Sequence, residues 1–393
     1  MTSEWHEVPL RELVGYISKG IAPSYAEEAS ETTIRVLNQK CNRNFRISYG
    51  DSRLHDTLKK KVPPERYVKP DDILINSTGA GTAGRIAQIE DVPSATTIDG
   101  HMILIRSNGK VTQKFLGYAL KAHQWEVLQL DEGSTGQTEL NRDRLLDEIM
   151  INYPVSFDEQ NAIVGTLESI DRKLIVNKEI NDNLLWQAQA LYKDRFIDLK
   201  PFNGKMPPDW QLGTVSEIIE LHDSKRIPLS SRERANLTKI YPYYGATSVM
   251  DYVDRYLFDG IYLLLGEDGT VVDDKGFPIL QYVEGKFWVN NHAHIITGKN
   301  GFTVETLYLL FSLTNVRSIV TGAVQPKISQ ANLNNVSVVI PSKAELSTFN
   351  SIVQPIFSQI RNLRAESDRL TSTRDILLPR LMSGEIDAAN IQL

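Results

Sequence analysis

The residues most suggestive of chemistry form a glycine-rich run at positions 73–86, ILINSTGAGTAGRI. An apolar segment leads into Gly79, Gly81 and Gly84 with the GxGxxG spacing of dinucleotide-binding turns. Such a turn requires a helix after the third glycine, because the helix N-terminus holds the pyrophosphate. Here only the short alternating run RIAQIEDVP follows, with no room for a crossover helix. We expect two strands joined by a Gly/Ser/Thr-rich loop, and no cofactor bound to this chain.

A second pattern imitates a metal-dependent nuclease. Asp273 and Asp274 are followed by Glu284 and Lys286, as in a D…ExK arrangement. The pattern is short and common, and FPILQYVEGKFWV is typical of a β-hairpin. The sequence also has no Asn/Asp-Pro-Pro-aromatic run, so methyl transfer chemistry is not expected. We predict a non-catalytic chain.

Two histidines share one face of a predicted strand. His292 and His294 alternate, so their side chains point to the same side. No third ligand is nearby in the sequence, which argues against a metal site. With Asn290 and Asn291 they could contact bases or phosphates. The alternative is that these polar residues are satisfied by hydrogen bonds within the fold.

Composition limits the class of protein. The chain has 393 residues, of which 41% are hydrophobic, enough for two or three domains with cores. Its single cysteine, Cys41, excludes a disulfide framework and fits a reducing compartment. The sequence shows no signal peptide pattern and no apolar run of about eighteen residues. We therefore expect a soluble cytoplasmic protein with no membrane partner.

The net charge of −6 hides a basic block. Residues 35–69 contain ten Lys and Arg against three Asp and Glu, a local net charge of +7. A solvated surface would explain this, but a phosphate backbone requires such a field.

The sequence is internally repeated. The corresponding positions are Trp5 and Trp210, Tyr67 and Tyr256, Gly81-Thr82 and Gly269-Thr270, the segments around His101 and His294, and Pro154 and Pro341. The second copy has GEDGT in place of GxGxxG, so a duplicated cofactor loop is improbable. The first copy carries 16 extra residues between its Trp and its Tyr.

Each copy ends in a segment predicted to form a long helix of about 30–35 residues. Ser156 with Glu159, and Ser342 with Glu345, form capping boxes. Apolar residues then follow a 4-3 spacing typical of a coiled-coil seam. The seam residues are Ile163, Leu167, Ile170, Leu174, Leu184, Ala188 and Leu191, then Phe349, Val353, Ile356, Ile360, Leu363, Leu370, Leu377 and Leu381, with Asn177, Asn181, Ser367 and Arg374 as polar interruptions. Pro355 should interrupt or kink the second helix.

These features predict an α+β protein ordered globular–helix–globular–helix. A short link after the first helix favours two helices packed as an antiparallel coiled coil. The two mixed α/β globular parts would then be related by a pseudo-twofold axis.

Three segments carry a resemblance to a known family. TRDILLPRLMSGEID at 373–387, FDEQNAIVGTLESID at 157–171 and WVNNHAHII at 288–296 resemble the specificity subunit of type I restriction–modification systems, the HsdS family. The resemblance covers essentially the whole chain and implies a DNA sequence reader. It implies target recognition domains at 1–155 and 201–341, a first coiled-coil spacer helix at 156–200, and a second helix with a C-terminal tail at 342–393.

The resemblance also implies partners. These would be double-stranded DNA with a bipartite interrupted site, two methyltransferase (modification) subunits, and motor–nuclease (restriction) subunits. S-adenosylmethionine, ATP and Mg would be bound by those subunits and not by this chain.

Base recognition requires Asn, Gln, Arg, Lys, Ser and Thr on exposed loops. The candidates are Asn38, Gln39, Lys40, Arg43, Arg46, Ser77, Thr78, Thr82, Arg85, His101, Thr135, Gln137, Arg142, Lys225, Arg226, Tyr243, Tyr244, Thr247, Thr270, Asn290, Asn291, His292, His294, Gln325 and Lys327. Two alternatives stay open. The chain could serve a related restriction enzyme that cuts on both sides of its site, or be a coiled-coil scaffold with two ligand-binding modules and no DNA.

Overall fold

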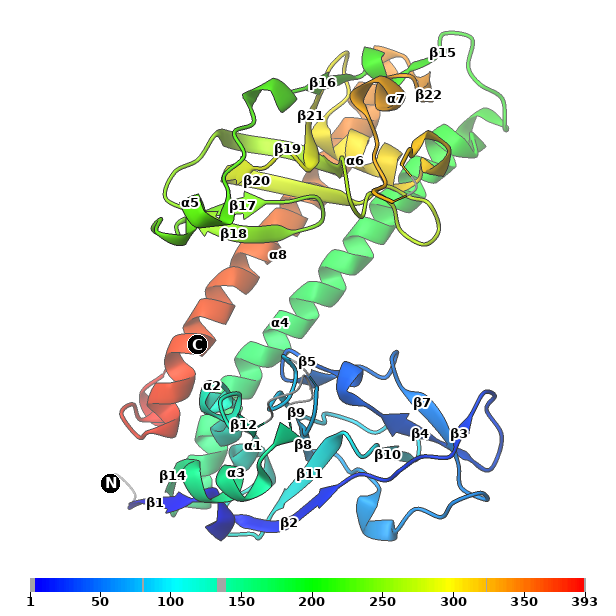
Figure 1. The fold of residues 1–393 in the computed structure, drawn as a ribbon. Helices are drawn as coiled ribbons and strands as arrows, with labels where there is room; N and C mark the ends of the chain where they lie inside the picture. The colour runs from blue at the N-terminus through cyan, green and yellow to red at the C-terminus, as the bar shows by residue number, and fades with distance from the viewer. Residues whose placement is uncertain (1–3, 80, 133–138, 323, 392–393) are drawn as a thin grey trace. The chain divides into compact units, whose positions relative to one another are not determined.

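The computed structural model describes residues 4–79, 81–132, 139–322 and 324–391 (Figure 1). The chain divides into two compact units. Unit 1 comprises residues 1–175 with 367–393, and unit 2 comprises residues 176–366. Both are mixed α/β, as the sequence predicts. No helix within the described ranges is long and apolar enough to cross a membrane.

Unit 1 is built on two four-stranded sheets. Their strands are β2 Val14–Lys19, β3 Tyr25–Ala26, β4 Thr33–Leu37, β7 Arg53–Asp56, β8 Ile73–Asn76, β9 Ile86–Gln88, β10 Thr96–Ile98 and β11 Met102–Ser107. The first sheet has the antiparallel order β2-β11-β8-β9, and the second the order β10-β4-β7-β3. The remaining elements are β1 Trp5–Pro9, β5 Asn42–Arg43, β6 Arg46–Ile47, β12 Asp131–Glu132, β13 Glu139–Leu140, β14 Met150–Pro154, α1 Gln113–Ala122, α2 Gln124–Val127 and α3 Arg142–Glu148.

Unit 2 has one six-stranded sheet. Its strands are β16 Ile219–Leu221, β17 Tyr241–Tyr244, β18 Val249–Val253, β19 Phe258–Gly266, β20 Leu280–Val289 and β21 Ala293–Gly298. Their order is β16-β21-β19-β20-β17-β18. The remaining elements are β15 Gln211–Thr214, β22 Ser337–Ile340, α5 Ser231–Ala235, α6 Val304–Ser312 and α7 Gln330–Asn334.

The central strands β8 and β19 each contain an unbroken apolar run because both of their faces are covered there. Ile73 and Ile75 of β8 pack into one core, whereas Leu74 packs into a second core on the other face. Leu263 and Leu264 of β19 divide in the same way. Alternate strand residues point to opposite faces, so a strand buried on both sides needs an unbroken apolar run.

The repeat in the sequence is matched by a repeat in topology. β1 pairs with β14, starting from Trp5 opposite Pro154, and β15 pairs with β22 in the same antiparallel sense. The order β2-β11-β8 in unit 1 corresponds to β16-β21-β19 in unit 2. Because Met102 lies opposite Asn76 and Ala293 opposite Gly266, His101 corresponds to His292. The sequence alignment, which placed His101 near His294, was wrong by two residues.

The two long helices are α4, Phe157–Tyr192, and α8, Lys343–Met382. Both are longer than expected, with 36 and 40 residues. The backbone N–H groups of Glu159 and Glu345 donate to Ser156 Oγ and Ser342 Oγ, each at 3.4 Å. The predicted caps are therefore confirmed. Glu159 itself accepts a hydrogen bond from Trp5 Nε1 at 3.1 Å, which ties β1 to the helix start.

Two helix predictions need correction. Pro355 does not interrupt α8, and a kink there stays a prediction; its side chain is exposed, so the carbonyl that loses its partner can be hydrated. Leu191 is 42% exposed, and Tyr192 and Phe196 are buried instead. A helix of 3.6 residues per turn drifts against a 3.5-residue pattern, which moves the buried face at the end of α4. Most other seam residues are buried, including Ile163, Leu167, Phe349, Val353 and Leu381.

In unit 1 a largely buried carboxylate joins the globular part to both long helices. Asp171 of α4 accepts hydrogen bonds from Tyr118 and Lys121, both at 2.9 Å, and from Arg374 of α8 at 3.3 Å. Burial alone would raise the Asp171 pKa, but Lys121, Tyr118 and Arg374 bring it below its usual value. Burial lowers the pKa of Lys121 and raises that of Tyr118.

Unit 2 uses an equivalent device with different residues. Glu305 of α6 accepts hydrogen bonds from Tyr282 at 2.8 Å, from Gln354 at 2.6 Å and from Arg361 at 3.3 Å. Gln354 and Arg361 belong to α8, so the sheet and α6 are fixed to this helix by a buried ionic contact.

Candidate nucleic-acid interface

Four loops of unit 2 meet at one end of its sheet, and we call this the loop end of unit 2. They comprise residues 223–226, 266–270, 290–294, and 321–322 with 324–330. Backbone hydrogen bonds join the last three of these loops in series. The Glu267 N–H donates to the His292 carbonyl at 2.8 Å, and the Ile328 N–H donates to the Glu267 carbonyl at 2.9 Å. The Gly269 N–H donates to the Pro326 carbonyl at 3.0 Å.

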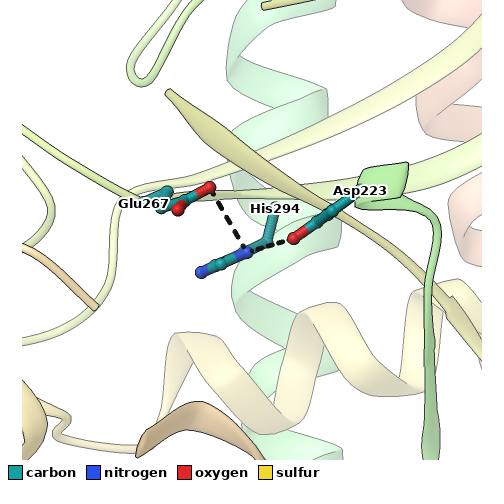
Figure 2. Close-up of side chains that lie close together, drawn as sticks. All are labelled: Asp223, Glu267 and His294. Carbon is teal, nitrogen blue, oxygen red and sulfur yellow. Dashed lines mark hydrogen bonds and ion pairs between the residues drawn. The ribbon is translucent and has the colours of Figure 1, made fainter. Parts of the chain in front are cut away.

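His294 lies at the centre of this loop end and is fully buried (Figure 2). Its Nδ1 is 2.6 Å from Asp223 Oδ2, and its Nε2 is 2.8 Å from the Ile328 carbonyl oxygen. A carboxylate and a carbonyl both accept, so both ring nitrogens must donate. Both ring nitrogens of His294 are therefore engaged by acceptors inside the loop end.

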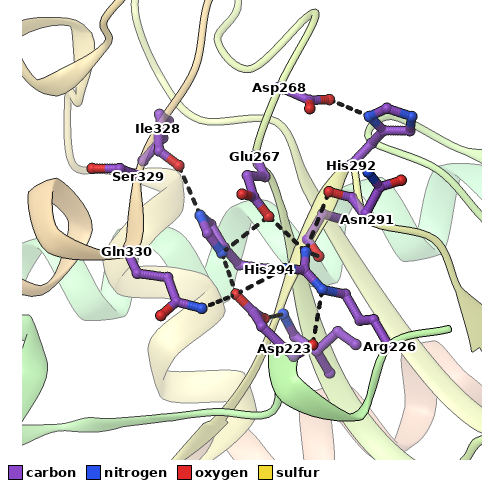
Figure 3. Close-up of polar contacts among 12 residues, drawn as sticks. Asp223, Arg226, Glu267, Asp268, Asn291, His292, His294, Ile328, Ser329 and Gln330 are labelled. Atoms are coloured by element: carbon purple, nitrogen blue, oxygen red, sulfur yellow. Dashed lines mark hydrogen bonds and ion pairs between the residues drawn. The ribbon is translucent and has the colours of Figure 1, made fainter. Parts of the chain in front are cut away.

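Asp223 collects most of the donors in the cluster (Figure 3). Besides His294, its carboxylate accepts from the Ile295 N–H at 2.9 Å and from Gln330 Nε2 at 2.6 Å. Burial would raise the Asp223 pKa, but these donors, His294 foremost, hold it below its usual value.

Glu267 carries the second negative charge and is matched by two cations. Arg226 Nη1 donates to Glu267 Oε2 at 2.6 Å, and Lys327 Nζ lies 3.2 Å from Oε1. Burial would raise the Glu267 pKa, but Arg226, His294 and Lys327 lower it. Arg226 also donates to the Ala293 carbonyl at 2.8 Å, which joins two of the loops.

Asp223, Glu267 and His294 each offer a ligand atom within 4.8 Å of the others, as a metal site would. The chemistry does not fit a metal. Both His294 nitrogens are used as donors, and Arg226 and Lys327 already neutralise the carboxylates. A cation would displace these contacts and meet like charge.

Unit 1 has an equivalent loop end, at residues 19–22, 76–79, 99–102 and 139–142. Thr78 Oγ1 is 2.8 Å from His101 Nδ1, as Asp268 is bonded to His292 in unit 2. The Leu140 N–H donates to the Ser77 carbonyl at 2.7 Å, matching Ile328 and Glu267. The same backbone frame is thus present in both units.

The side chains on that frame differ in the sign of their charge. By strand register Lys19 takes the place of Asp223, and Ile103 takes the place of His294. Glu139 forms an isolated backbone β-bridge with Thr78, as Lys327 does with Asp268, so Glu139 takes the place of Lys327. Lys19 and Glu139 form an ion pair whose side chains are 42% and 55% exposed.

The glycine-rich loop joins antiparallel strands, as predicted. β8 and β9 are neighbours in the sheet, so no crossover helix can follow the third glycine. Gly84 has a φ of +83°, and a Cβ there would lie 2.8 Å from the Val127 carbonyl oxygen. Tight packing and left-handed backbone explain this glycine.

The basic block lies on unit 1 around β4 to β7. Lys40 and Arg43 are exposed and form no ion pair with any residue in the described ranges. Arg46 lies 3.2 Å from Glu90, and the Arg53 guanidinium stacks on Tyr25. These side chains leave positive charge available to a polyanion.

The remaining candidates fall into three groups. Exposed side chains are Lys40, Arg43, His101, Arg142, Lys225, Thr247, Thr270, Asn291, Gln325 and Lys327. Partly buried side chains are Asn38, Gln39, Arg46, Thr78, Thr82, Arg85, Arg226, Tyr244 and His292. Thr135 and Gln137 lie outside the described residues. Contact of these residues with DNA stays a prediction.

Four candidates are buried and need a correction. Ser77, Tyr243, Asn290 and His294 are at most 4% exposed. Asn290 Oδ1 accepts from the His292 N–H at 2.8 Å, and Tyr243 Oη accepts from the Leu229 N–H at 2.9 Å. They support loops from beneath instead of presenting polar groups to a ligand. Of the two open interpretations of the histidines, the hydrogen-bonded one holds for His294.

Sequence reasoning missed the residues that hold the loops. Asp223, Glu267 and Gln330 were not among the candidates, nor were Lys19 and Glu139. Part of the signal was present in the repeat, because Glu267 directly follows β19, the strand that corresponds to β8. In the nuclease-like pattern, Asp273 caps a turn through the Lys275 N–H at 2.9 Å, and Glu284 pairs with Arg361 at 3.4 Å.

Comparison with known proteins agrees with this architecture. The family described as "Type I restriction modification DNA specificity domain" matches residues 2–185 and 207–371. The HindI specificity subunit of Haemophilus influenzae is 34% identical over an alignment covering 98% of this chain and 100% of that protein. The MjaIX specificity subunit of Methanocaldococcus jannaschii is 26% identical over 86% of this chain and 83% of that protein.

A solved structure has the same fold. The S subunit of a type I restriction–modification system from M. genitalium gives a TM-score of 0.57 at 17% identity, covering 97% of this chain and 96% of that one. Since the family match spans most of both repeats, the chain belongs to the type I restriction–modification DNA specificity family.

Proposed function

We propose that this chain reads an interrupted DNA sequence in two halves, one with the loop end of each unit. The observation that carries the proposal is the duplicated loop end, with the same hydrogen-bonded frame in each unit. Two similar readers on one chain suit a bipartite site with a fixed separation.

Recognition would combine two kinds of contact. Exposed cations such as Lys40 and Arg43 would hold phosphates, which fixes position without specifying sequence. Exposed amides and hydroxyls such as Asn291, Gln325 and Thr270 would contact base edges. Because the chain carries a net charge of −6, tight binding would need the assembled complex.

The long helices would form an antiparallel pair that sets the spacer and docks two methyltransferase subunits. Within unit 2, Asn177 donates to Glu366 at 2.8 Å, and Arg195 pairs with Glu345. Within unit 1, Arg374 contacts Asp171. In unit 2 residue numbers therefore rise along α4 as they fall along α8. Chemistry would belong to the partner subunits, so the chain alone should neither methylate nor cleave DNA.

The test is methylome sequencing of a host that carries this chain with its modification subunit. We expect modified adenines within a two-part motif of constant spacing, lost when this chain is deleted. A contiguous motif, or methylation that persists without the chain, would contradict the proposal.

A further inference from the structure

We propose that Asp223 and His294 form a buried cross-link that positions the DNA-reading loops of unit 2 alone. Losing it would relax recognition of one half of the DNA site and leave the other half unchanged. The inference rests on the proposed function, since it names residues that act on the same surface without touching DNA.

The geometry makes His294 a bridge between two loops. On one side it reaches Asp223, two residues after β16, and on the other the Ile328 carbonyl, directly after the hairpin closed by the Thr321–Lys327 bridge. Gln330 closes the same bridge from the far side, donating to Asp223 at 2.6 Å. The base of the hairpin is thereby fixed at two points.

The cross-link also reaches the other two loops. Arg226 follows Asp223 closely and donates to the Ala293 carbonyl at 2.8 Å and the Asn291 carbonyl at 3.3 Å. It binds Glu267 as well, and Glu267 binds Lys327. Exposed Thr270, Asn291 and Gln325 therefore lie on loops whose positions depend on one buried network.

Charge makes the bridge hard to replace. Around the ring of His294 lie Asp223, with Glu267 at 3.7 Å, the Ile328 carbonyl and the Gln330 amide. Lys327 pairs with Glu267, and Arg226 pairs with Glu267 and lies 3.6 Å from Asp223 Oδ2. An alanine would leave the buried Ile328 carbonyl without its donor and take one donor from the buried Asp223 carboxylate, which keeps the Ile295 N–H and Gln330. Buried polar groups that lose a donor draw water or rearrange.

Among the residues of unit 1 that the structure describes, no counterpart to this network is present. Ile103 stands at the position of His294 and is fully buried among apolar residues. An effect confined to one half-site follows from this asymmetry, and a general loss of DNA affinity does not.

The experiment uses the full chain assembled with its modification subunit. Methylation is measured on a DNA library in which each base of both half-sites is varied. For His294→Ala and the conservative His294→Gln, we expect discrimination to fall about tenfold at several bases of one half-site. The same half-site should respond when Thr270, Asn291 and Gln325 are replaced together by Ala, which assigns it to unit 2.

A stability-matched control separates positioning from unfolding. Leu309→Ala in α6 removes a fully buried side chain of unit 2 away from the loops. It should lower thermal stability without changing base preference. Unchanged preferences in both His294 variants, or equal relaxation of both half-sites, would overturn the inference. Absence of any two-part motif with the unaltered chain would instead overturn the proposed function.

A second measurement does not depend on DNA. Nitrogen-15 NMR of the labelled chain, with the His294 signal assigned by its absence in His294→Gln, reports the ring protons. We expect both ring nitrogens to carry hydrogen at neutral pH. A singly protonated ring would contradict the cross-link.

Discussion

In unit 2 the loop end is held by Asp223 and His294, whose side chains are 3% and 0% exposed. In unit 1 the equivalent place carries the exposed ion pair of Lys19 and Glu139. The backbone hydrogen bonds are shared, so the frame does not depend on either solution. The comparison teaches that main-chain pairing fixes where the loops begin, while side chains are free to differ, even in sign.

The difference between the two loop ends is tested most strongly by Asp223→Ala, for which we expect the largest effect. The change leaves the His294 ring, the Ile295 N–H and the Gln330 amide without their shared acceptor. Removing one partner of a buried pair costs about 3–5 kcal/mol. Urea denaturation should show this loss in free energy of unfolding. A loss below about 1 kcal/mol would mean that the cluster is hydrated and loosely held.

A second test concerns the basic block of unit 1, residues 35–69. Replacing Lys40, Arg43 and Arg46 by Ala should weaken DNA binding of the assembled complex. Each lost phosphate contact lowers the salt slope by roughly 0.9, so the triple variant should lose up to about three. Fluorescence anisotropy against salt concentration measures this.

Lys299→Ala serves as the control for the basic block. This exposed lysine follows the end of β21 opposite to the loop end of unit 2. Its replacement should leave the salt slope unchanged. An unaltered slope in the triple variant would place the basic block on a surface that faces solvent.

Acid should loosen the loop end of unit 2. The Asp223 and Glu267 pKa values are both lowered in the folded chain. A carboxylate with a depressed folded pKa contributes stability above its unfolded value, near 4, and loses it as pH falls through the folded value. Free energy of unfolding should therefore decline below about pH 4. In Asp223→Asn the protein should be less stable at neutral pH, with a shallower decline.

The smallest effect is expected from Lys19→Ala. Its pair with Glu139 is exposed, and such pairs contribute less than about 1 kcal/mol. Thermal unfolding should be nearly unchanged. A loss as large as that of Asp223→Ala would show that the two loop ends are held equally, against the comparison drawn above.

Much of the fold was predictable because it depends on local patterns. The apolar run at 73–75 marked a strand buried on both faces, and Ser156 and Ser342 marked the two helix starts. Pro355 misled because its cost depends on exposure, which the sequence does not reveal. The exposed loop residues were identified from their residue types, but the residues that hold those loops in place were not.

The supports could not be predicted because they are assembled by tertiary contact. Asp223 and Gln330 are 107 residues apart and bond directly. His294 was expected at a surface because it lies two residues from His292, and alternate residues of a strand point to the same face. Strand alternation gives the face of a sheet but not whether that face is covered.

The central claim is that two readers are held apart by the two long helices. The most direct test inserts one heptad into both helices at the border of the units, after Ile175 in α4 and after Ser367 in α8. A heptad keeps the apolar faces in phase and adds about 10 Å, close to three base pairs. Methylome sequencing should report unchanged half-sites with a longer spacer. Altered half-sites with the original spacer would contradict the account.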